Sequence, residues 1–242
     1  MNEIRPDKES ANLEYHLAQD RMARLTNYYR WIHRLVSPWI SGRVLEIGCG
    51  AGAFLQLYQR QAAEVVAVDI NPQLIGQVSS ASFSCPVNAM VRDLREPWVF
   101  PGVTTGFSTI IALDVLEHFE DDQSIIASMA GALAPGGVAV LKVPAQKALY
   151  SSVDEASGHY RRYDLSDIKR LAERAGLAVA AHRRMNVVGA FVYRFKRGSK
   201  TNFSRSLPRW FLWFGNAMVP VLRLIDRIVP LPGQSLIVVL RK

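Results

Sequence analysis

A run of glycines directly after a short apolar segment is the feature that most restricts how this chain can fold. Residues 43–47 (RVLEI) are typical of a buried β-strand, and Gly48, Gly50 and Gly52 follow it at once. Glycine permits a tight turn that brings main-chain N–H groups against a ligand, and the helix that follows presents its positive end there. A strand, a glycine turn and a helix in this order indicate a nucleotide-type binding edge in an α/β sheet.

The rest of the chain alternates between strand and helix patterns. Apolar runs predict strands, and periodic or capped segments predict helices, as at Asn71-Pro72, where a cap precedes a proline in the first turn. The predicted strands are residues 43–47, 64–69, 87–91, 107–113, 138–143, 177–182 and 235–240, with a turn at 135–137; the predicted helices are 13–40, 53–60, the segment after 71, 122–133 and 165–175. This alternation favours a mostly parallel sheet covered on both faces.

The length and the cysteine content exclude other classes of protein. A chain of 242 residues that is 49% hydrophobic suits one large domain with a full core. The two cysteines, Cys49 and Cys85, cannot supply a disulfide framework or a structural zinc module. The polar start MNEIRPDKES lacks the apolar run of a secretory signal, so we expect a cytoplasmic protein.

The excess of positive charge lies in the last quarter of the chain. Residues 183–242 hold 12 Lys and Arg but one acidic residue, Asp226. Within this quarter, residues 186–233 interrupt the alternation with an aromatic, basic segment that contains four prolines. Three roles fit it: a lid over the active site, an amphipathic segment at a membrane interface, or helices packed on the sheet. An RNA partner would use the same charge and would show a steep salt dependence of affinity.

Two ligand classes fit the glycine turn. Its spacing satisfies the dinucleotide fingerprint, and Asp69 lies at a suitable distance to bind a ribose, so a dehydrogenase has to be considered. However, Glu46 before the turn would repel a pyrophosphate, and Asp93 after the third strand could accept a hydrogen bond from an adenine amino group. No Tyr is followed four residues later by Lys, as in short-chain dehydrogenases. The favoured ligand bears an adenosyl group, is cationic and lacks phosphate.

At these positions the chain resembles the class I S-adenosylmethionine-dependent methyltransferases, of the type 11 and type 23 kind. The matching segments are VLEIGCGAG (44–52), AVDIN (67–71), RDL (92–94), LDVLEHFEDD (113–122) and LAPGGVAVLKVP (133–144). Each segment is a loose match, but five in order at the right spacing are specific. The resemblance covers about residues 40–182, and residues 235–242 resemble the family's last strand.

This resemblance implies an architecture. We expect an α/β, Rossmann-like doubly wound sheet of about seven strands, the last antiparallel, with a helical insertion before it. The whole chain, 1–242, would be a single methyltransferase domain. Its parts would be an N-terminal helical cap (1–40), a cofactor-binding core (41–185), a helical, basic and aromatic insertion (186–233) and the last strand (234–242).

The resemblance also implies S-adenosyl-L-methionine as the cofactor. Glu46 would orient the methionine part, Asp69 would hold the ribose hydroxyls, and Asp93 would meet the adenine edge. The expected cofactor-binding residues are Glu46, Gly48, Cys49, Gly50, Gly52, Asp69, Ile70, Asp93, Leu94, Asp114, Val115 and Tyr28. Capping of the helices that follow the strands is the alternative role for Asp69 and Asp93.

The segment Asp114-Val-Leu-Glu117-His118 supplies the best candidates for catalysis, because positions i, i+3 and i+4 share one face of a helical turn. With His159 they form a set that resembles the metal sites of some ubiquinone-pathway O-methyltransferases and small-RNA ribose methyltransferases. We predict His118, His159 and Glu117 as catalytic residues without a resident metal. A divalent cation on Asp114, Glu117, His118 and His159, and purely structural roles, stay open as alternatives.

A loop after the fifth strand, GHYRRY (158–163), is expected on the substrate side. Tyr160, Arg161, Arg162 and Tyr163 suit recognition of a carboxylate or phosphate together with stacking. The alternative is a surface loop that pairs with nearby acidic residues, namely Asp154, Glu155 and Asp164.

The sequence therefore predicts methyl transfer to a small-molecule or lipid-like acceptor, with O-methylation favoured over N- or C-methylation. Peripheral membrane contact would run through residues 186–233, and nucleic acid is not the expected partner. The rival functions are an RNA-modifying methyltransferase that uses the basic C-terminal region, and a protein that binds S-adenosylmethionine without turnover.

Overall fold

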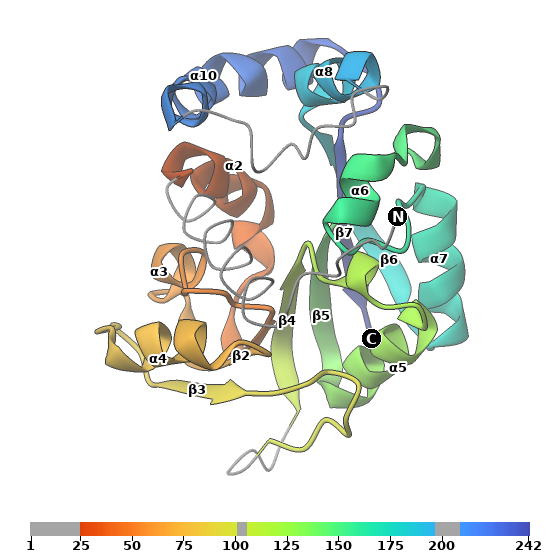
Figure 1. The fold of residues 1–242 in the computed structure, drawn as a ribbon. Helices are drawn as coiled ribbons and strands as arrows, with labels where there is room; N and C mark the ends of the chain where they lie inside the picture. The colour runs from red at the N-terminus through yellow and green to blue at the C-terminus, as the bar shows by residue number, and fades with distance from the viewer. Residues whose placement is uncertain (1–24, 101–105, 197–208) are drawn as a thin grey trace, which may run out of the picture.

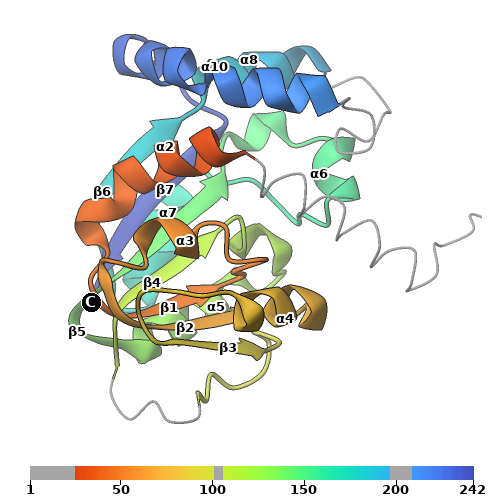
Figure 2. The same cartoon turned by 90° about the vertical axis from the view of Figure 1, so that its left-hand side faces the viewer.

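A computed structural model describes residues 25–100, 106–196 and 209–242. These residues form a seven-stranded sheet of order β3-β2-β1-β4-β5-β7-β6 with helices on both faces (Figures 1 and 2). The strands are β1 (Gly42–Ile47), β2 (Ala62–Asp69), β3 (Val87–Val91), β4 (Phe107–Leu113), β5 (Leu133–Pro144), β6 (Ala178–Met185) and β7 (Ser235–Arg241). The first five pair in parallel, whereas β7 is antiparallel to both β5 and β6. The predicted fold class is confirmed, including the antiparallel last strand.

Two hydrophobic clusters pack on opposite faces of this sheet. Alternate residues of a strand point to opposite faces, and β1 shows the pattern, since Leu45 and Ile47 join one cluster while Val44 joins the other. The cluster of Leu45 contains buried residues of α5 (Asp122–Ala132) and α7 (Leu165–Arg174). The cluster of Val44 contains buried residues of α2 (Thr26–Val36), α3 (Leu55–Tyr58) and α4 (Pro72–Ser80).

Local sequence accounts for where several helices begin. The Asn71 side chain accepts hydrogen bonds from the N–H groups of Gln73 and Leu74, and Pro72 occupies the first turn of α4. Asp121 caps α5 in the same way through the N–H of Ser124. A short helix that the sequence did not predict, α6 (Ser152–Ala156), begins at Ser151 with a capping box.

The predicted turn at Pro135-Gly136-Gly137 lies inside the span of β5 rather than before it, because β5 begins at Leu133 and not at Val138. The ladder between β4 and β5 shifts register here, from Phe107 opposite Leu133 to Thr109 opposite Val138. Residues 134–137 of β5 lie opposite residue 108 alone of β4, and Gly136 has a φ of +76°, so the chain makes a turn within this strand. The predicted helix 53–60 is also shorter than expected, since α3 spans only residues 55–58.

The structure describes only part of the predicted N-terminal helix and part of the predicted insertion 186–233. Of the predicted helix 13–40, residues 13–24 lie outside the described part, and the described remainder contains α2 followed by a 3-10 turn (Ser37–Trp39). The predicted insertion contains α8 (Val187–Lys196) and α10 (Arg209–Ile228), which lie side by side at one end of the molecule (Figures 1 and 2). Among the described residues, no helix combines the length and the apolar character needed to cross a membrane.

Candidate active site

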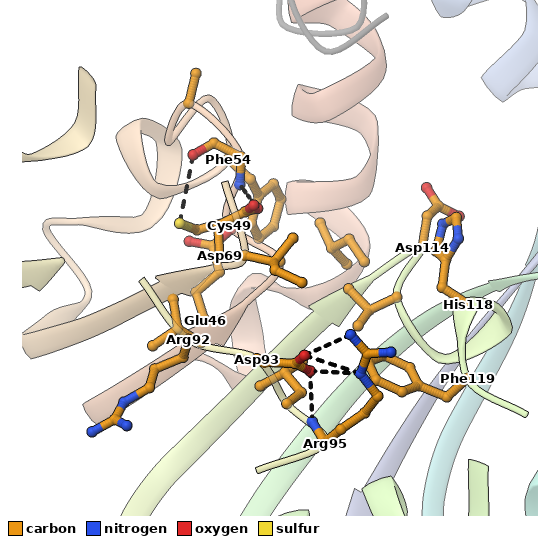
Figure 3. Close-up of a pocket in the computed structure, with 18 of the residues that line it drawn as sticks. Glu46, Cys49, Phe54, Asp69, Arg92, Asp93, Arg95, Asp114, His118 and Phe119 are labelled. Atoms are coloured by element: carbon orange, nitrogen blue, oxygen red, sulfur yellow. Dashed lines mark hydrogen bonds and ion pairs between the residues drawn. The ribbon is translucent and has the colours of Figure 1, made fainter. Parts of the chain in front are cut away.

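A cavity of about 850 Å³ opens at the carboxyl ends of β1, β2 and β4 (Figure 3). Such ends of parallel strands are where open α/β sheets bind their ligands. Ten of the predicted cofactor-binding residues line it, namely Glu46, Gly48, Cys49, Gly50, Asp69, Ile70, Asp93, Leu94, Asp114 and Val115. The predicted Gly52 and Tyr28 do not line it, although the neighbouring Tyr29 does. No described residue of α8 or α10 lines it, so a lid formed by these helices is not seen.

The glycine turn has the backbone that its sequence requires. Gly48 and Gly50 have φ angles of +66° and +53°, in the left-handed region that other residues rarely adopt. A Cβ on Gly48 would lie 2.6 Å from the Val115 side chain, so the turn also needs the missing side chain for space. Backbone atoms of the turn therefore form the wall of the cavity next to Val115.

Glu46 is buried beneath this turn, and the Tyr58 hydroxyl of α3 donates a hydrogen bond to its Oε2 at 2.7 Å. Burial raises the pKa of Glu46 to about 8, although the hydrogen bond from Tyr58 opposes this shift. A carboxyl group poised near neutrality would ionise when a cationic ligand group approaches. Tyr58 was not among the residues predicted from the sequence.

Asp69 organises the backbone around the cavity. Its Oδ2 accepts a hydrogen bond from the N–H of Gly50 at 2.9 Å, and its Oδ1 accepts one from the N–H of Asn71 at 2.9 Å. Burial raises the pKa of Asp69, and these hydrogen bonds oppose the shift. The N–H of Ile70 is a third backbone partner, and because a carboxylate offers about four lone pairs, Asp69 could still accept a bond from a ribose hydroxyl.

Asp93 lies at the rim of the cavity and is engaged by Arg95. The Arg95 guanidinium binds both carboxylate oxygens, with Nη2 2.6 Å from Oδ2 (Figure 3). This pairing holds the pKa of Asp93 below its ordinary value. Arg95 and Arg92 both line the cavity and were not predicted as site residues. An adenine amino group at Asp93 would share the carboxylate with Arg95.

Asp114 has a φ of +55° and forms an ion pair with Lys142 of β5. Lys142 is buried, and its Nζ lies 5.6 Å from the centre of the Tyr28 ring. Burial alone would lower the pKa of Lys142, but Asp114 and Tyr28 outweigh burial and raise it. Tyr28 thus packs behind the cavity wall, and its predicted contact with the cofactor stays a prediction. The sequence signal for this ion pair is a lysine within the apolar segment LKVP, and Lys142 was not among the predicted site residues.

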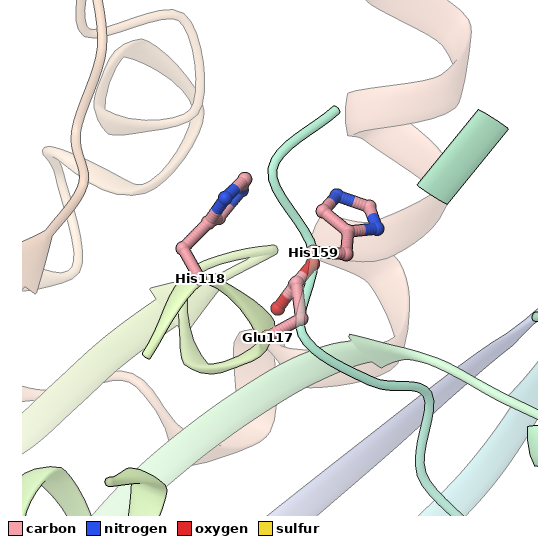
Figure 4. Close-up of side chains that lie close together, drawn as sticks. All are labelled: Glu117, His118 and His159. Carbon is pink, nitrogen blue, oxygen red and sulfur yellow. The ribbon is translucent and has the colours of Figure 1, made fainter. Parts of the chain in front are cut away.

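Glu117, His118 and His159 lie close together (Figure 4), and His118 lines the cavity. Glu117 and His118 belong to the 3-10 turn Leu116–His118, and the ring centres of His118 and His159 are 4.8 Å apart at an interplanar angle of 80°. The three side chains each place one ligand atom within 4.8 Å of the others, so they could hold a divalent cation. Asp114, the fourth predicted ligand, is outside this group.

Each imidazole is oriented by a partner at Nδ1. The Nδ1 atom of His118 lies 3.2 Å from the Gly158 carbonyl, and that of His159 lies 3.2 Å from Oδ1 of Asp154. Such partners fix a histidine ring and leave Nε2 for a substrate or a metal. Of the three, only His118 lines the cavity.

Glu117 differs from the histidines because both of its carboxylate oxygens are buried without a hydrogen-bond partner in the described part of the chain. Burial, together with Asp114, raises the pKa of Glu117 well above its ordinary value. Packing around the imidazole and the adjacent His159 lower the pKa of His118. A neutral His118 is therefore favoured near pH 7, which is the form that can accept a proton.

The four predicted substrate-binding residues line a second cavity of about 470 Å³, and Tyr160 lines both cavities. Within it, Arg162 and Tyr163 are buried. Arg162 pairs with Asp154 at 2.9 Å, and the Tyr163 hydroxyl lies 3.0 Å from Asp122, as does Arg161 at 3.1 Å. Tyr160 is 54% exposed and is the member most available to an acceptor. The other three hold the loop in place, so their predicted contact with substrate stays a prediction.

A family model described as a methyltransferase domain matches residues 16–182 of this chain. The chain belongs to this family. Among curated proteins, the methyltransferase is 28% identical over 161 residues to a ubiquinone biosynthesis O-methyltransferase of Xanthomonas campestris pv. campestris. That match covers 57% of this chain and 65% of the relative, so it spans less than two thirds of the relative's length.

Solved structures share the fold of the methyltransferase. An S-adenosylmethionine-dependent methyltransferase from Mesorhizobium loti aligns with a TM-score of 0.59 at 16% identity, over 86% of this chain and 95% of that one. The N-methyltransferase NodS from Bradyrhizobium japonicum, solved with S-adenosyl-L-homocysteine, aligns with a TM-score of 0.54 at 16% identity, over 89% and 85%. The family match and this fold confirm the predicted class, a class I S-adenosylmethionine-dependent methyltransferase, and its cofactor.

Proposed function

We propose that this methyltransferase transfers a methyl group from S-adenosyl-L-methionine to a hydroxyl oxygen of a small or lipid-like acceptor. The observation that carries the proposal is that one cavity joins the glycine turn to the imidazole of His118. The bound cofactor supplies an electrophilic methyl group on a sulfonium. An acceptor hydroxyl next to that methyl group needs only to be aligned with it and to have a nearby group that takes its proton.

The residues of the cavity fit this cofactor. The glycine turn leaves backbone rather than side chains against the ligand, and the buried Glu46 suits an ammonium group. Asp69 retains acceptor capacity for a ribose hydroxyl beyond its backbone bonds, and Asp93 lies at the rim where an adenine edge would be reached. These residues would hold the cofactor with its methyl end toward His118.

The acceptor step follows from the state of His118. With the cofactor bound, the methyl group would pass from sulfur to the acceptor oxygen, and Nε2 of His118 would take the hydroxyl proton. His159 lies edge-to-face against His118, and Asp154 orients His159, so the pair presents a fixed imidazole to the acceptor. The relatives that are named ubiquinone biosynthesis O-methyltransferases support oxygen as the acceptor atom.

One observation favours a second form of the same reaction, with a divalent cation. The Glu117 carboxylate is buried without a partner in the described residues, beside two histidines whose Nδ1 atoms are already engaged. Glu117, His118 and His159 would be the ligands of such an ion, which lowers the pKa of a coordinated hydroxyl.

The test begins with calorimetric titration of the full chain with S-adenosyl-L-homocysteine, followed by turnover with a panel of phenols, catechols, hydroxy acids, amines and RNA. We expect binding of the nucleoside and a methylated oxygen in the product, identified by mass spectrometry. Binding without turnover on any acceptor class would favour a non-catalytic protein, and methylated RNA or nitrogen would overturn the proposed acceptor. Activity that is lost with a chelator and restored by added Mg²⁺ or Zn²⁺ would select the cation form.

A further inference from the structure

The long helix α10 exposes its apolar side to solvent. Its large exposed apolar residues are Trp213 (72% exposed), Phe214 (52%), Val221 (47%), Leu224 (55%) and Ile228 (71%). Ala217 and Pro220, also exposed, lie between them at helical spacing. Positions three, four and seven apart share one face of a helix, so these residues form one continuous apolar stripe.

Polar contacts on the opposite side of α10 fix this orientation. Oδ1 of Asn216 accepts a hydrogen bond from the N–H of Asn27 at 2.9 Å, and the Asn27 side chain donates to the Asn216 carbonyl at 3.1 Å. Asp226 accepts hydrogen bonds from the N–H groups of Asn186 and Val187. Rotation of α10 to bury the stripe would break all of these bonds. The outward apolar face is therefore built into the fold.

The neighbouring helix α8 adds to the exposed apolar surface at this end of the molecule. Phe191 and Val192 of α8 are 48% and 38% exposed, and Leu231 after α10 is 43% exposed. A surface of this extent marks an interaction site rather than scattered surface residues. We call the stripe of α10 with these three residues the apolar end face.

The charge of the surrounding chain indicates which partner this face suits. Of the described cationic residues of this quarter, Arg241 and Lys242 lie at the end of β7, away from this face, whereas Arg194 and Arg227 belong to α8 and α10. The one acidic residue of 183–242, Asp226, is turned inward to the N–H groups at the start of α8. Arg194 and Arg227 are exposed beside the apolar residues. A second copy of this chain would bring like charges together, whereas an anionic lipid surface offers opposite charge and an apolar layer.

We propose that the apolar end face docks this protein on the surface of an anionic lipid bilayer. α10 would lie in the plane of the interface, with its aromatic and aliphatic side chains among the acyl chains and its arginines at the headgroups. The docking does not depend on which acceptor the active site uses.

The apolar end face lies near the edge of the sheet at which the cavity opens. β6 runs parallel to β5 because both are antiparallel to β7, so β6 ends at the same edge of the sheet as the strands that form the cavity. α8 begins directly after β6, and α10 is bonded to α2, the helix whose Tyr29 lines the cavity. If the proposed function holds, a lipid-like acceptor would reach the site from the membrane to which the protein is docked.

The test is co-sedimentation of the full chain with vesicles. Phosphatidylcholine vesicles are compared with vesicles of phosphatidylcholine and phosphatidylglycerol, using the wild type, a Trp213→Ser/Leu224→Ser variant and Val99→Ser. Val99, which follows β3, is 65% exposed and is not part of the apolar end face, so it serves as the matched control. We expect binding to the anionic vesicles, weakened about tenfold or more in the double variant and unchanged in Val99→Ser.

Two further measurements keep the result interpretable. Titration with S-adenosyl-L-homocysteine checks that each variant is folded. If the Trp213→Ser/Leu224→Ser variant does not bind this nucleoside, Phe214→Ser/Ile228→Ser replaces it. Light scattering after size exclusion reports the oligomeric state. Equal vesicle binding by wild type and folded double variants would overturn the proposal. So would a wild-type dimer that becomes monomeric in the variants while neither binds vesicles, because the face would then be a contact between copies.

Discussion

The Tyr58 hydroxyl donates a hydrogen bond to Oε2 of Glu46, 2.7 Å away, in the buried space beneath the glycine turn. The bond stabilises the charged form of the carboxylate, while burial works against that form and raises the pKa of Glu46 to about 8. The group that the sequence assigns to the methionine part of the cofactor is therefore mostly protonated at pH 7 in the free protein.

This state predicts that cofactor binding releases a proton. A cationic ligand group favours the carboxylate, so the pKa of Glu46 falls on binding, and the affinity should rise with pH up to the pKa of the free protein, about 8. Calorimetry below about pH 7.5, where the ligand's own amino group stays charged, measures the released protons through the buffer dependence of the heat.

Two variants control this prediction. Glu46→Gln removes the titrating group and should abolish the proton release. Tyr58→Phe removes the bond that lowers the pKa, so it should raise the pKa of Glu46 further and steepen the loss of affinity toward neutral pH. A heat that is independent of buffer in the wild type would show that Glu46 does not meet a cationic group.

Replacing Asp69 should weaken cofactor binding. Asp69→Ala removes the bonds to Gly50 and Asn71 as well as those expected to the ribose, and should cost about 1.5–3 kcal/mol of binding free energy, the scale of charge-assisted hydrogen bonds. Asp69→Asn keeps one acceptor and should lose less. Both are measured by calorimetric titration with S-adenosyl-L-homocysteine, and unchanged affinity in Asp69→Ala would contradict the ribose assignment.

Replacing His118 should separate turnover from cofactor binding. His118→Ala removes the imidazole that lines the cavity and should reduce kcat by about 10²–10⁴-fold, with little change in cofactor affinity. His182→Ala, on β6 away from the cavity, is the matched control and should leave both quantities unchanged. A loss of cofactor affinity in step with the loss of turnover would instead give His118 a role in holding the nucleoside.

Much of the cofactor side of the site could be predicted from sequence because it is local. Gly48, Gly50 and Asp69 act through backbone conformation and through bonds to residues near strand ends, which a linear pattern reveals. The mostly parallel sheet likewise agrees with the alternation of strands and helices, and the antiparallel last strand with the family resemblance. The start of β5 was predicted at Val138 rather than at Leu133 because a Pro-Gly-Gly turn ordinarily lies outside a strand.

The interactions that join distant segments could not be predicted in this way. Lys142 meets Asp114 across neighbouring strands, 28 positions apart. By contrast, the pair of Arg162 with Asp154 is local, and it agrees with the alternative in which the loop pairs with nearby acidic residues. A periodic pattern ordinarily predicts that the apolar side of an amphipathic helix faces the core, and α10 departs from this rule. For α10 the orientation depends on Asn216 finding Asn27, a residue 189 positions away.

Asp114 and Lys142 are unequally buried, so removing one charge or the other should change the free energy of unfolding by different amounts. The Lys142 side chain is 3% exposed and that of Asp114 is 42% exposed. Asp114→Asn keeps the left-handed backbone accessible but leaves a buried ammonium without its counter-ion, which should cost about 3–5 kcal/mol of unfolding free energy. Lys142→Met leaves a carboxylate that reaches water, so it should cost less.

Urea unfolding at pH 7 measures the two costs, and the double variant completes a cycle. With both charges removed, no buried ion is left unpaired, so Asp114→Asn/Lys142→Met should be more stable than Asp114→Asn alone. Strictly additive costs would mean that the two side chains do not interact. A larger loss in Lys142→Met than in Asp114→Asn would mean that packing of the lysine stem against Tyr28, rather than the charge pair, dominates at this position.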